Sequence, residues 1–187
     1  MNSTAEILGV VDVGTGLLLG ARLVPSPHQD ARPPGAAPVL VVVHGISLPP
    51  GHFGGPWIDA LFTGVLPPGE HPYFAAVQGL RVSAHVCITR EGGVTQYVPF
   101  HRRAWHAGAS VWKYRGACND YSVGIELEGT DELPYTPAQY RQLNQVLRAL
   151  RAAYPSLARG EVVGHSDIAP GRKTDPGSAF DWSQVQR

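Results

Sequence analysis

The sequence predicts a mixed α/β fold: one domain over residues 1–187, with a mixed central β-sheet flanked by helices. Apolar runs of strand length recur along the chain, and a helical repeat of apolar side chains follows residue 136. The expected order is strand, loop, helix, two paired strands, a further strand, helix and strand. A chain of 187 residues suits one domain, and an apolar content of 43% is sufficient for a core.

Composition narrows the classes of function. The formal net charge is zero, which gives no argument for nucleic acid or an anionic membrane as partner. No Lys or Arg precedes Arg22, so the basic region of a secretory signal is missing, and the nearby apolar segments are too short to span a bilayer. We therefore expect a cytoplasmic protein, with no membrane partner, and a monomer. The two cysteines, Cys87 and Cys118, do not make a disulfide framework.

The first part of the chain predicts short strands and then a longer one. Residues 6–24 are expected to form one or two short strands around a turn, and the five prolines of residues 25–38 predict a loop. Residues 39–43 form a nearly continuous apolar run, typical of a strand covered on both faces, although such a run alone does not exclude a helix. His44 lies directly at its end.

Residues 47–74 form a long, loop-rich insertion after this strand. Pro56 is expected to open a short helix over residues 57–62, which Gly64 ends. Residues 73–77 predict one or two further helical turns. Long loops of this kind are usually functional or disordered, and the aromatic side chains of the insertion argue against disorder.

Further strands come next. Residues 83–88 and 94–98 are expected to pair as a hairpin, because the residues between them supply glycines for the turn. Residues 122–128 alternate strictly, with Gly124 and Glu126 on the side opposite the apolar residues. A glycine there leaves space for another group to approach.

A helix is expected after residue 136. Thr136 and Gln139 form a capping box, and Pro137 occupies the first helical position. Apolar residues then recur at helical spacing as far as Tyr154, and Pro155 marks the end.

Residues 164–177 contain two of the candidate functional residues, a histidine and an aspartate, in a segment rich in proline and glycine. Their prolines and glycines exclude a continuous helix, and the apolar pair before them ends a strand. His165 would therefore lie at a strand end, and Asp175 would return towards it on a loop. Together with His44 they are nitrogen and oxygen ligands of the kinds that zinc takes. A loop rich in Pro, Gly, Asp and Lys is also commonly only a solvated turn, and this alternative stays open.

Three protein ligands would leave a fourth position for water, as in catalytic rather than structural zinc sites. Zinc lowers the pKa of bound water and polarises a carbonyl. Attack on an amide also needs a carboxylate to accept a proton and a cation for the tetrahedral oxyanion, and Glu126 and Lys173 are candidates. The alternatives are that Glu126 lies on a solvated strand face, paired with an arginine, and that Lys173 is a surface lysine.

Several longer motifs follow one another in a distinctive order. They are VVH (42–44), ISLPP (46–50), FGGPWIDALFTG (53–64), RVSAH (81–85), AWHAG (104–108), CND (118–120), GIELEGT (124–130), GHSDIAP (164–170) and RKTDPG (172–177). With these motifs the chain resembles, from about residue 22 to residue 182, the zinc-dependent N-acetylmuramoyl-L-alanine amidases of type 2 and the related peptidoglycan-recognition proteins. Within that group it looks most like the cytoplasmic 1,6-anhydro-N-acetylmuramyl-L-alanine amidases of cell-wall recycling.

The resemblance implies zinc on His44, His165 and Asp175, with Glu126 as catalytic carboxylate and Lys173 as stabiliser of the oxyanion. An aspartate as third ligand favours the intracellular branch, since relatives often have cysteine there. The implied reaction is hydrolysis of the amide between the lactyl group of (1,6-anhydro-)N-acetylmuramic acid and the L-alanine of the stem peptide. The groove for sugar and peptide is expected to be lined by the 47–74 insertion and by Trp105, His106, Tyr73, Arg81 and Arg115.

Two positions depart from the family pattern. Gly45 stands where an asparagine is expected, which puts a hydrogen bond beside the site in doubt. Ala117 stands where an arginine is expected, which puts recognition of a stem-peptide carboxylate in doubt, and Arg115 is a candidate substitute. His85 is either a further ligand or a residue that orients the site or lies in the core.

Two other classes of function stand beside hydrolysis. The protein could bind muropeptides without cutting them, but such modules typically lack a zinc ligand, and all three candidates are present here. Zinc could also merely hold together an unrelated binding protein, which would leave the surrounding polar groups without a role. We therefore favour an amidase, acting on soluble anhydro-muropeptides in preference to intact murein, because the insertion is expected to close one end of the groove.

Overall fold

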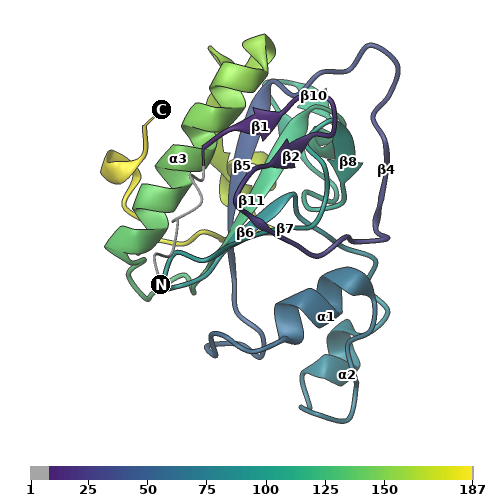
Figure 1. Cartoon of the computed structure of the whole chain (residues 1–187). Helices are drawn as coiled ribbons and strands as arrows, with labels where there is room; N and C mark the ends of the chain where they lie inside the picture. The colour runs from purple at the N-terminus through teal and green to yellow at the C-terminus, as the bar shows by residue number, and fades with distance from the viewer. Residues whose placement is uncertain (1–8, 187) are drawn as a thin grey trace, which may run out of the picture.

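Parallel strands form the centre of the structure. In the computed structural model, which describes residues 9–186, the main sheet has the strand order β12–β5–β11–β6–β7–β3 (Figure 1). These strands are β12 (Glu161–Gly164), β5 (Leu40–Ile46), β11 (Ser122–Glu128), β6 (Val86–Ile88), β7 (Val94–Gln96) and β3 (Arg22–Leu23). The first four are mutually parallel, β7 is antiparallel to β6, and β3 is parallel to β7. The predicted mixed sheet and the predicted hairpin are confirmed.

The register of the parallel strands determines which side chains meet at the edge of the sheet. His44 of β5 lies level with Glu126 of β11, and Val43 lies level with Gly164, the last residue of β12. His165 therefore follows at the level of His44. Parallel strands end at the same edge of a sheet, which is where open α/β proteins commonly bind ligands.

One face of the sheet is covered by α3 (Pro137–Ala153). The helix begins at the predicted capping box: the Thr136 hydroxyl accepts a hydrogen bond from the backbone N–H of Gln139 at 3.2 Å, and the Gln139 side chain accepts one from the backbone N–H of Thr136 at 3.0 Å. Its apolar stripe and the sheet form one cluster, whose members include Val41, Val43, Val123, Ile125, Leu127, Leu143, Leu147 and Leu150.

Two separate apolar clusters cover the opposite face. One contains α1 (Trp57–Thr63) and α2 (Phe74–Val77), which lie together away from α3 in Figure 1, and includes Cys87. The other includes Val42, Tyr121 and Val163. Burial on both faces is what the nearly continuous apolar run of β5 predicted.

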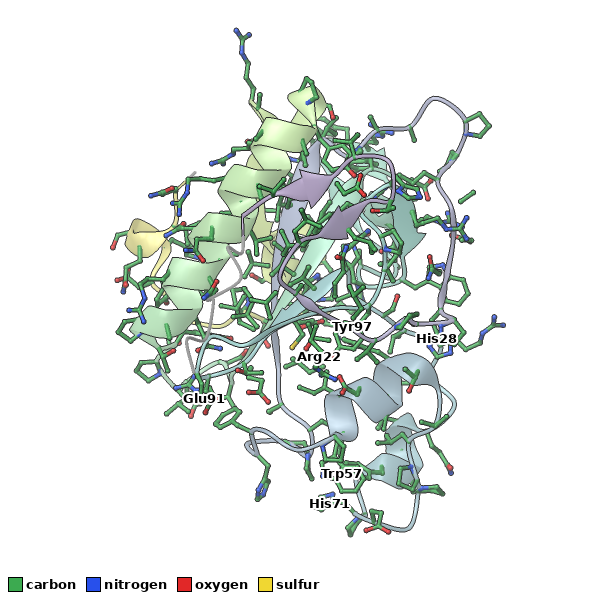
Figure 2. All side chains as sticks on the ribbon, viewed as in Figure 1. Arg22, His28, Trp57, His71, Glu91 and Tyr97 are labelled. Atoms are coloured by element: carbon green, nitrogen blue, oxygen red, sulfur yellow. The ribbon has the colours of Figure 1, made fainter. Side chains whose placement is uncertain are left out.

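Helix α1 is fixed to the sheet by one carboxylate. Asp59 accepts hydrogen bonds from the guanidinium of Arg22 on β3 at 2.8 Å and from the hydroxyl of Tyr97 at 2.6 Å. Figure 2 shows Arg22 and Tyr97 directly above the helix. The helix ends at Gly64, whose φ of 78° is the left-handed conformation that favours glycine. The insertion is thus an ordered part of the fold.

Short elements lie outside the main sheet, and one of them corrects a prediction. β4 (Gln29–Ala31), within the expected loop 25–38, pairs with β8 (Arg102–Ala104), and Arg103 binds the carboxylate of Asp30 at 2.6 Å. The formation of such a short strand depends on pairing with a partner strand, so the local sequence does not predict it. The others are β1 (Val11–Asp12), β2 (Leu17–Leu18), β9 (Val111–Trp112), β10 (Arg115–Gly116), the single helical turn α4 (His165–Ile168), and the 3₁₀ turns Cys118–Asp120, Pro155–Leu157 and Trp182–Gln184.

The start of the expected strand region, residues 6–8, lies outside the described residues. Cys87 and Cys118 are both free and buried, which agrees with the absence of a disulfide framework. Between residues 9 and 186, the structure has no helix that is both long and apolar enough to cross a bilayer.

Candidate active site

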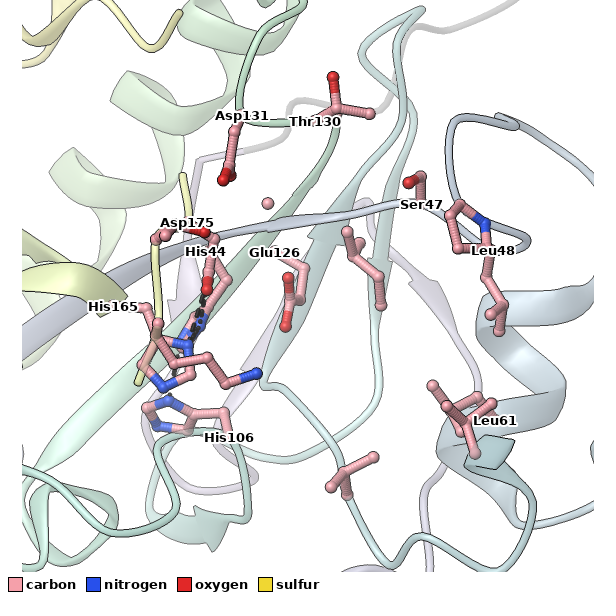
Figure 3. A pocket seen from close by; sticks show the side chains of 18 of the residues that line it. His44, Ser47, Leu48, Leu61, His106, Glu126, Thr130, Asp131, His165 and Asp175 are labelled. Carbon is pink, nitrogen blue, oxygen red and sulfur yellow. Dashed lines mark hydrogen bonds and ion pairs between the residues drawn. The ribbon is translucent and has the colours of Figure 1, made fainter. Parts of the chain in front are cut away.

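Three side chains converge at the edge where β5 and β12 end. His44 comes from β5, His165 is the first residue of α4 directly after β12, and Asp175 returns on the following loop. His44 Nδ1 lies 2.9 Å from His165 Nδ1 and 3.2 Å from Asp175 Oδ2, and His165 Nδ1 lies 3.1 Å from the same oxygen. Figure 3 shows the three side chains pointing towards one another.

The chemistry of this group fits a divalent metal ion. The two imidazoles are buried and the carboxylate is half-buried, and one donor atom of each lies within 4.8 Å of the others. Tetrahedral zinc ligands at about 2.0–2.2 Å from the ion stand about 3.3–3.6 Å apart, close to the separations seen here. Two histidines and one aspartate also leave a fourth position open. The solvated-turn alternative for residues 164–177 does not describe this loop, because its two key side chains are directed inward.

The protonation states of His44 and Asp175 suit this role. Burial lowers the pKa of His44 to about 4, so its imidazole is neutral at neutral pH. Burial alone would raise the pKa of Asp175, but hydrogen bonds with His165 and His44 outweigh it and hold that pKa well below its ordinary value. A metal ion needs neutral imidazoles and an ionised carboxylate as ligands.

Glu126 lies beside this group with an unusual carboxylate. It is 9% exposed, and within residues 9–186 its Oε2 is buried without a hydrogen-bond partner. Burial, followed by the charge of Asp175, raises its pKa well above the ordinary value. The alternative of a solvated strand face paired with an arginine is therefore wrong.

A cleft of about 890 Å³ opens above these residues. Lys173 is exposed at its wall, and Tyr73 and His106 also line it. The 47–74 insertion contributes one side of the cleft, through Ser47, Leu48, Pro50, Gly51, Leu61, Phe62 and Tyr73. Figure 3 shows Leu48 and Leu61 on this side, across the cleft from the metal-type ligands. The insertion thus faces the candidate metal site.

Three of the residues expected to bind substrate lie elsewhere. The described residues that line the cleft do not include Trp105, Arg81 or Arg115. Trp105 stacks on His28, with ring centroids 6.0 Å apart, and the guanidinium of Arg81 lies 5.1 Å from the Trp105 ring. The guanidinium of Arg115 lies 3.8 Å from the Tyr121 ring.

His85 belongs to the core and not to the cluster of candidate metal ligands. Its Nδ1 accepts a hydrogen bond from the backbone N–H of Gly124 at 3.0 Å, so its Nε2 carries the proton and donates to the carbonyl of Arg102 at 3.1 Å. Burial lowers its pKa to about 3. Both ring nitrogens are therefore satisfied within the protein, which resolves the ambiguity left by the sequence.

Comparison with known proteins assigns the family. The family model for N-acetylmuramoyl-L-alanine amidase matches residues 34–178. The chain belongs to this amidase family. AmpD of Escherichia coli K12, named 1,6-anhydro-N-acetylmuramyl-L-alanine amidase, is 63% identical over 171 residues, which are 91% of this chain and 93% of AmpD.

Solved structures of related proteins agree with the assignment of this chain to the amidase family. The crystal structure of a selenomethionine derivative of AmpD superposes with a TM-score of 0.88 at 60% identity, covering 91% of this chain and 94% of that chain. AmiD of E. coli, solved with the substrate anhydro-N-acetylmuramic acid-L-Ala-D-γ-Glu-L-Lys, gives a TM-score of 0.57 at 28% identity, covering 82% of this chain and 58% of that chain. The AmpD-type amidase fold expected from the resemblance is confirmed.

One buried residue packed next to the candidate site was not indicated by the sequence. Tyr135 occupies a slot between two glycines: a Cβ on Gly45 would collide with its hydroxyl oxygen, and a Cβ on Gly129 would collide with its ring. The hydroxyl donates to the carbonyl of Pro176 at 3.0 Å, next to Asp175. Gly45, where the family pattern has asparagine, therefore leaves room for the phenol. The glycine was visible in the sequence, but no local pattern names a partner so far along the chain.

Proposed function

We propose that this amidase is a zinc enzyme that hydrolyses the amide between the lactyl group of 1,6-anhydro-N-acetylmuramic acid and the L-alanine of the stem peptide. The observation that carries the proposal is the carboxylate of Glu126, buried beside His44, His165 and Asp175 at the floor of an open cleft. The names of AmpD and of the AmiD complex support the choice of substrate.

In this proposal the chain's own residues position the reaction and move its proton. A zinc ion on His44, His165 and Asp175 would lower the pKa of a bound water and polarise the lactyl carbonyl. Glu126 accepts the proton of the attacking water on Oε2 and then, as a carboxylic acid, gives it to the leaving nitrogen of L-alanine. Its raised pKa suits a group that must hold a proton between the two transfers.

Lys173 supplies the positive charge at the wall of the same cleft. The tetrahedral oxyanion forms on the former carbonyl oxygen, and a nearby cation stabilises it more than it stabilises the neutral amide. Lys173→Met should therefore lower kcat by about 10²–10³-fold, as loss of an oxyanion donor does. Lys113→Met is the matched control, because Lys113 pairs with Glu161 outside the cleft. Equal rates of the two variants would remove Lys173 from the reaction.

Metal analysis tests the ligand set. The purified protein should contain one zinc ion per chain, and His44→Ala and Asp175→Ala should lose most of it. His52→Ala is the control, since His52 is exposed and outside the cluster. Full zinc content in either ligand variant would exclude that residue from the site.

Product analysis tests the activity. The zinc-loaded protein is incubated with a 1,6-anhydro-muropeptide, and the masses of the products are measured. Free stem peptide and anhydro-N-acetylmuramic acid are expected. Substrate that is bound but unchanged would instead support the alternative of a muropeptide-binding module.

Substrate preference follows from the wall formed by the 47–74 insertion. Leu48 and Leu61 bound the cleft on the side opposite the ligands, so we propose that a terminal anhydro sugar fits and a continuing glycan chain does not. The value of kcat/KM should be higher for an anhydro-muropeptide than for the reducing-end form, and whole sacculi should release little peptide. Similar rates on all three substrates would contradict a groove that is closed at one end. The cytoplasmic location and monomeric state stay predictions, which cell fractionation and light scattering would test.

A further inference from the structure

The imidazole of His106 lies against the backbone of β11. A Cβ added to Gly124 would collide with Cγ of His106 and would lie 2.6 Å from its Nδ1. The space that the sequence predicted beside Gly124 is therefore filled by this ring. In Figure 3 His106 lies directly beneath His44, joined to it by a dashed line.

A chain of hydrogen bonds leads from a buried carbonyl through His106 to His44. The Ser122 hydroxyl oxygen lies 2.6 Å from the carbonyl oxygen of Cys118. His106 Nε2 lies 3.2 Å from the same hydroxyl oxygen, and His106 Nδ1 lies 2.9 Å from His44 Nε2.

The directions of these bonds follow from the carbonyl, which can only accept. Ser122 must donate its proton to Cys118, so its oxygen is left to accept from Nε2–H of His106. With Nε2 protonated in the neutral ring, His106 Nδ1 is an acceptor, and His44 Nε2–H donates to it. The lone pair of His44 then lies on Nδ1, the atom that faces His165 and Asp175.

The loop of His106 orients the second histidine as well. The carbonyl of Ala107 accepts a hydrogen bond from Nε2 of His165 at 3.2 Å, which leaves His165 Nδ1 free in the same way. The loop is itself fixed, because the Asn119 side-chain oxygen accepts from the backbone N–H of His106 at 3.1 Å and of Ala107 at 2.8 Å.

We propose that His106 is a positioning residue, which with Ser122 sets the tautomer and orientation of His44 so that its Nδ1 lone pair is presented to the metal. The proposal rests on the metal site proposed above. It assigns the ring of His106 to the protein's own hydrogen bonds, and not primarily to contact with substrate. Groups that hold metal-ligating histidines in this way typically change metal affinity by about 10–100-fold when they are removed.

The test compares two replacements of His106. His106→Phe keeps a flat ring on Gly124 but removes the acceptor, whereas His106→Asn places an amide oxygen near the position of Nδ1. Zinc affinity, measured by competition with a chelator, should fall about 10–100-fold in His106→Phe and be largely restored in His106→Asn. Gly124→Ala should resemble His106→Phe, because its Cβ displaces the ring.

A second readout uses no metal. In the metal-free protein, the acceptor on His106 competes with Asp175 Oδ2 for the single proton of the His44 ring. The ¹⁵N chemical shifts of that ring should therefore show a larger fraction of the Nε2–H tautomer in the unmodified chain and in His106→Asn than in His106→Phe. Unchanged zinc affinity and an unchanged His44 tautomer in His106→Phe would overturn the proposal. So would equal losses in the Phe and Asn variants, since the acceptor would then not matter. Failure of the unmodified protein to bind zinc would refute the metal site, and the tautomer measurement would still decide the role of His106.

Discussion

Both faces of β11 are buried, but their side chains differ in kind: one face is apolar, and the other carries polar residues and a glycine. Val123, Ile125 and Leu127 are completely buried in the apolar cluster beneath α3. On the other face, each of the alternating residues has a polar or steric function. Ser122 donates to a carbonyl, Gly124 makes room for His106, and the two glutamates face the site side. The degree of burial therefore does not distinguish core from site in this amidase.

The two glutamates of this face differ in their hydrogen bonds. Glu128 accepts hydrogen bonds from the backbone N–H of Gly54 at 2.7 Å and of Arg90 at 3.1 Å, and so ties the insertion to the end of the strand. Glu126 Oε2 has no such partner in the described part of the chain. A buried polar atom without a partner is uncommon in folded proteins and costs stability. This unpartnered oxygen beside His44 and Asp175 supports the catalytic role proposed for Glu126, whereas the carboxylate of Glu128 is used in backbone hydrogen bonds.

The largest expected effect is on turnover. Glu126→Gln should lower kcat by about 10²–10⁴-fold, because a group that transfers protons is replaced by one that does not. Zinc content and circular dichroism should stay unchanged. A variant with nearly normal kcat would show that another group accepts the proton.

The same substitution should change how stability depends on pH in the metal-free protein. Because the pKa of Glu126 is raised in the folded state, the folded protein keeps a proton that the unfolded chain releases above about pH 4.3. The contribution of Glu126 to the free energy of unfolding should therefore fall as pH rises from about 4.3 to the raised pKa, and be level above it. Glu126→Gln should remove this decline. Urea unfolding at several pH values measures it, and parallel curves for the two proteins would contradict the raised pKa.

The next effect concerns the opposite face of the same strand. Ile125→Ala should lower the free energy of unfolding by about 2–5 kcal/mol, since a fully buried side chain leaves a cavity. Turnover per folded molecule should change little. A loss of activity in Ile125→Ala as large as that in Glu126→Gln, without loss of stability, would contradict the division of β11 into a core face and a site face.

A smaller effect is expected in the slot of Tyr135. Gly45→Ala should cost about 1–3 kcal/mol of unfolding free energy, because its Cβ displaces the hydroxyl that donates to Pro176. In a Tyr135→Phe background the added Cβ would lie 3.7 Å from the nearest ring atom, an ordinary contact, so the same change should cost much less. A double-mutant cycle measures the coupling, and additive costs would show that the hydroxyl is not the obstacle.

The smallest effect is expected for Glu128→Gln. One amide oxygen can still accept a backbone N–H, so about 0.5–1.5 kcal/mol of stability should be lost and kcat should be nearly unchanged. A loss of turnover comparable to that of Glu126→Gln would erase the distinction between the two carboxylates.

The regular elements were predictable from the sequence because their signals are local. The capping box of Thr136 and Gln139, the apolar run of β5 and the alternation of β11 each lie within a few neighbouring residues. β4 was not predictable, since it depends on pairing with β8. The helix α3 and the two central strands beneath it, β5 and β11, could therefore be predicted from the sequence.

The sequence predicted which residues form the candidate site, but it did not predict the hydrogen bonds and ring contacts that hold them. Strand ends and the resemblance named His44, Glu126 and Asp175, and the structure brings these side chains together at one edge of the cleft. The role of Tyr135 and the position of the His106 ring depend on glycines whose partners are distant in sequence. Trp105 was expected in the groove from its motif, but its stacking on His28 is a tertiary contact that no motif encodes.

The place of β5 in the sheet has a consequence for the synthesis of the protein. Its sequence LVVVHGI pairs on one side with β11 and on the other with β12, and both are made later. While the chain emerges from the ribosome, both edges of this apolar segment therefore lack their partner strands, which favours aggregation. Such long-range parallel pairing also slows folding. The strand that carries His44 is thus at risk on the ribosome until the last strand, and the loop that brings Asp175, have been translated.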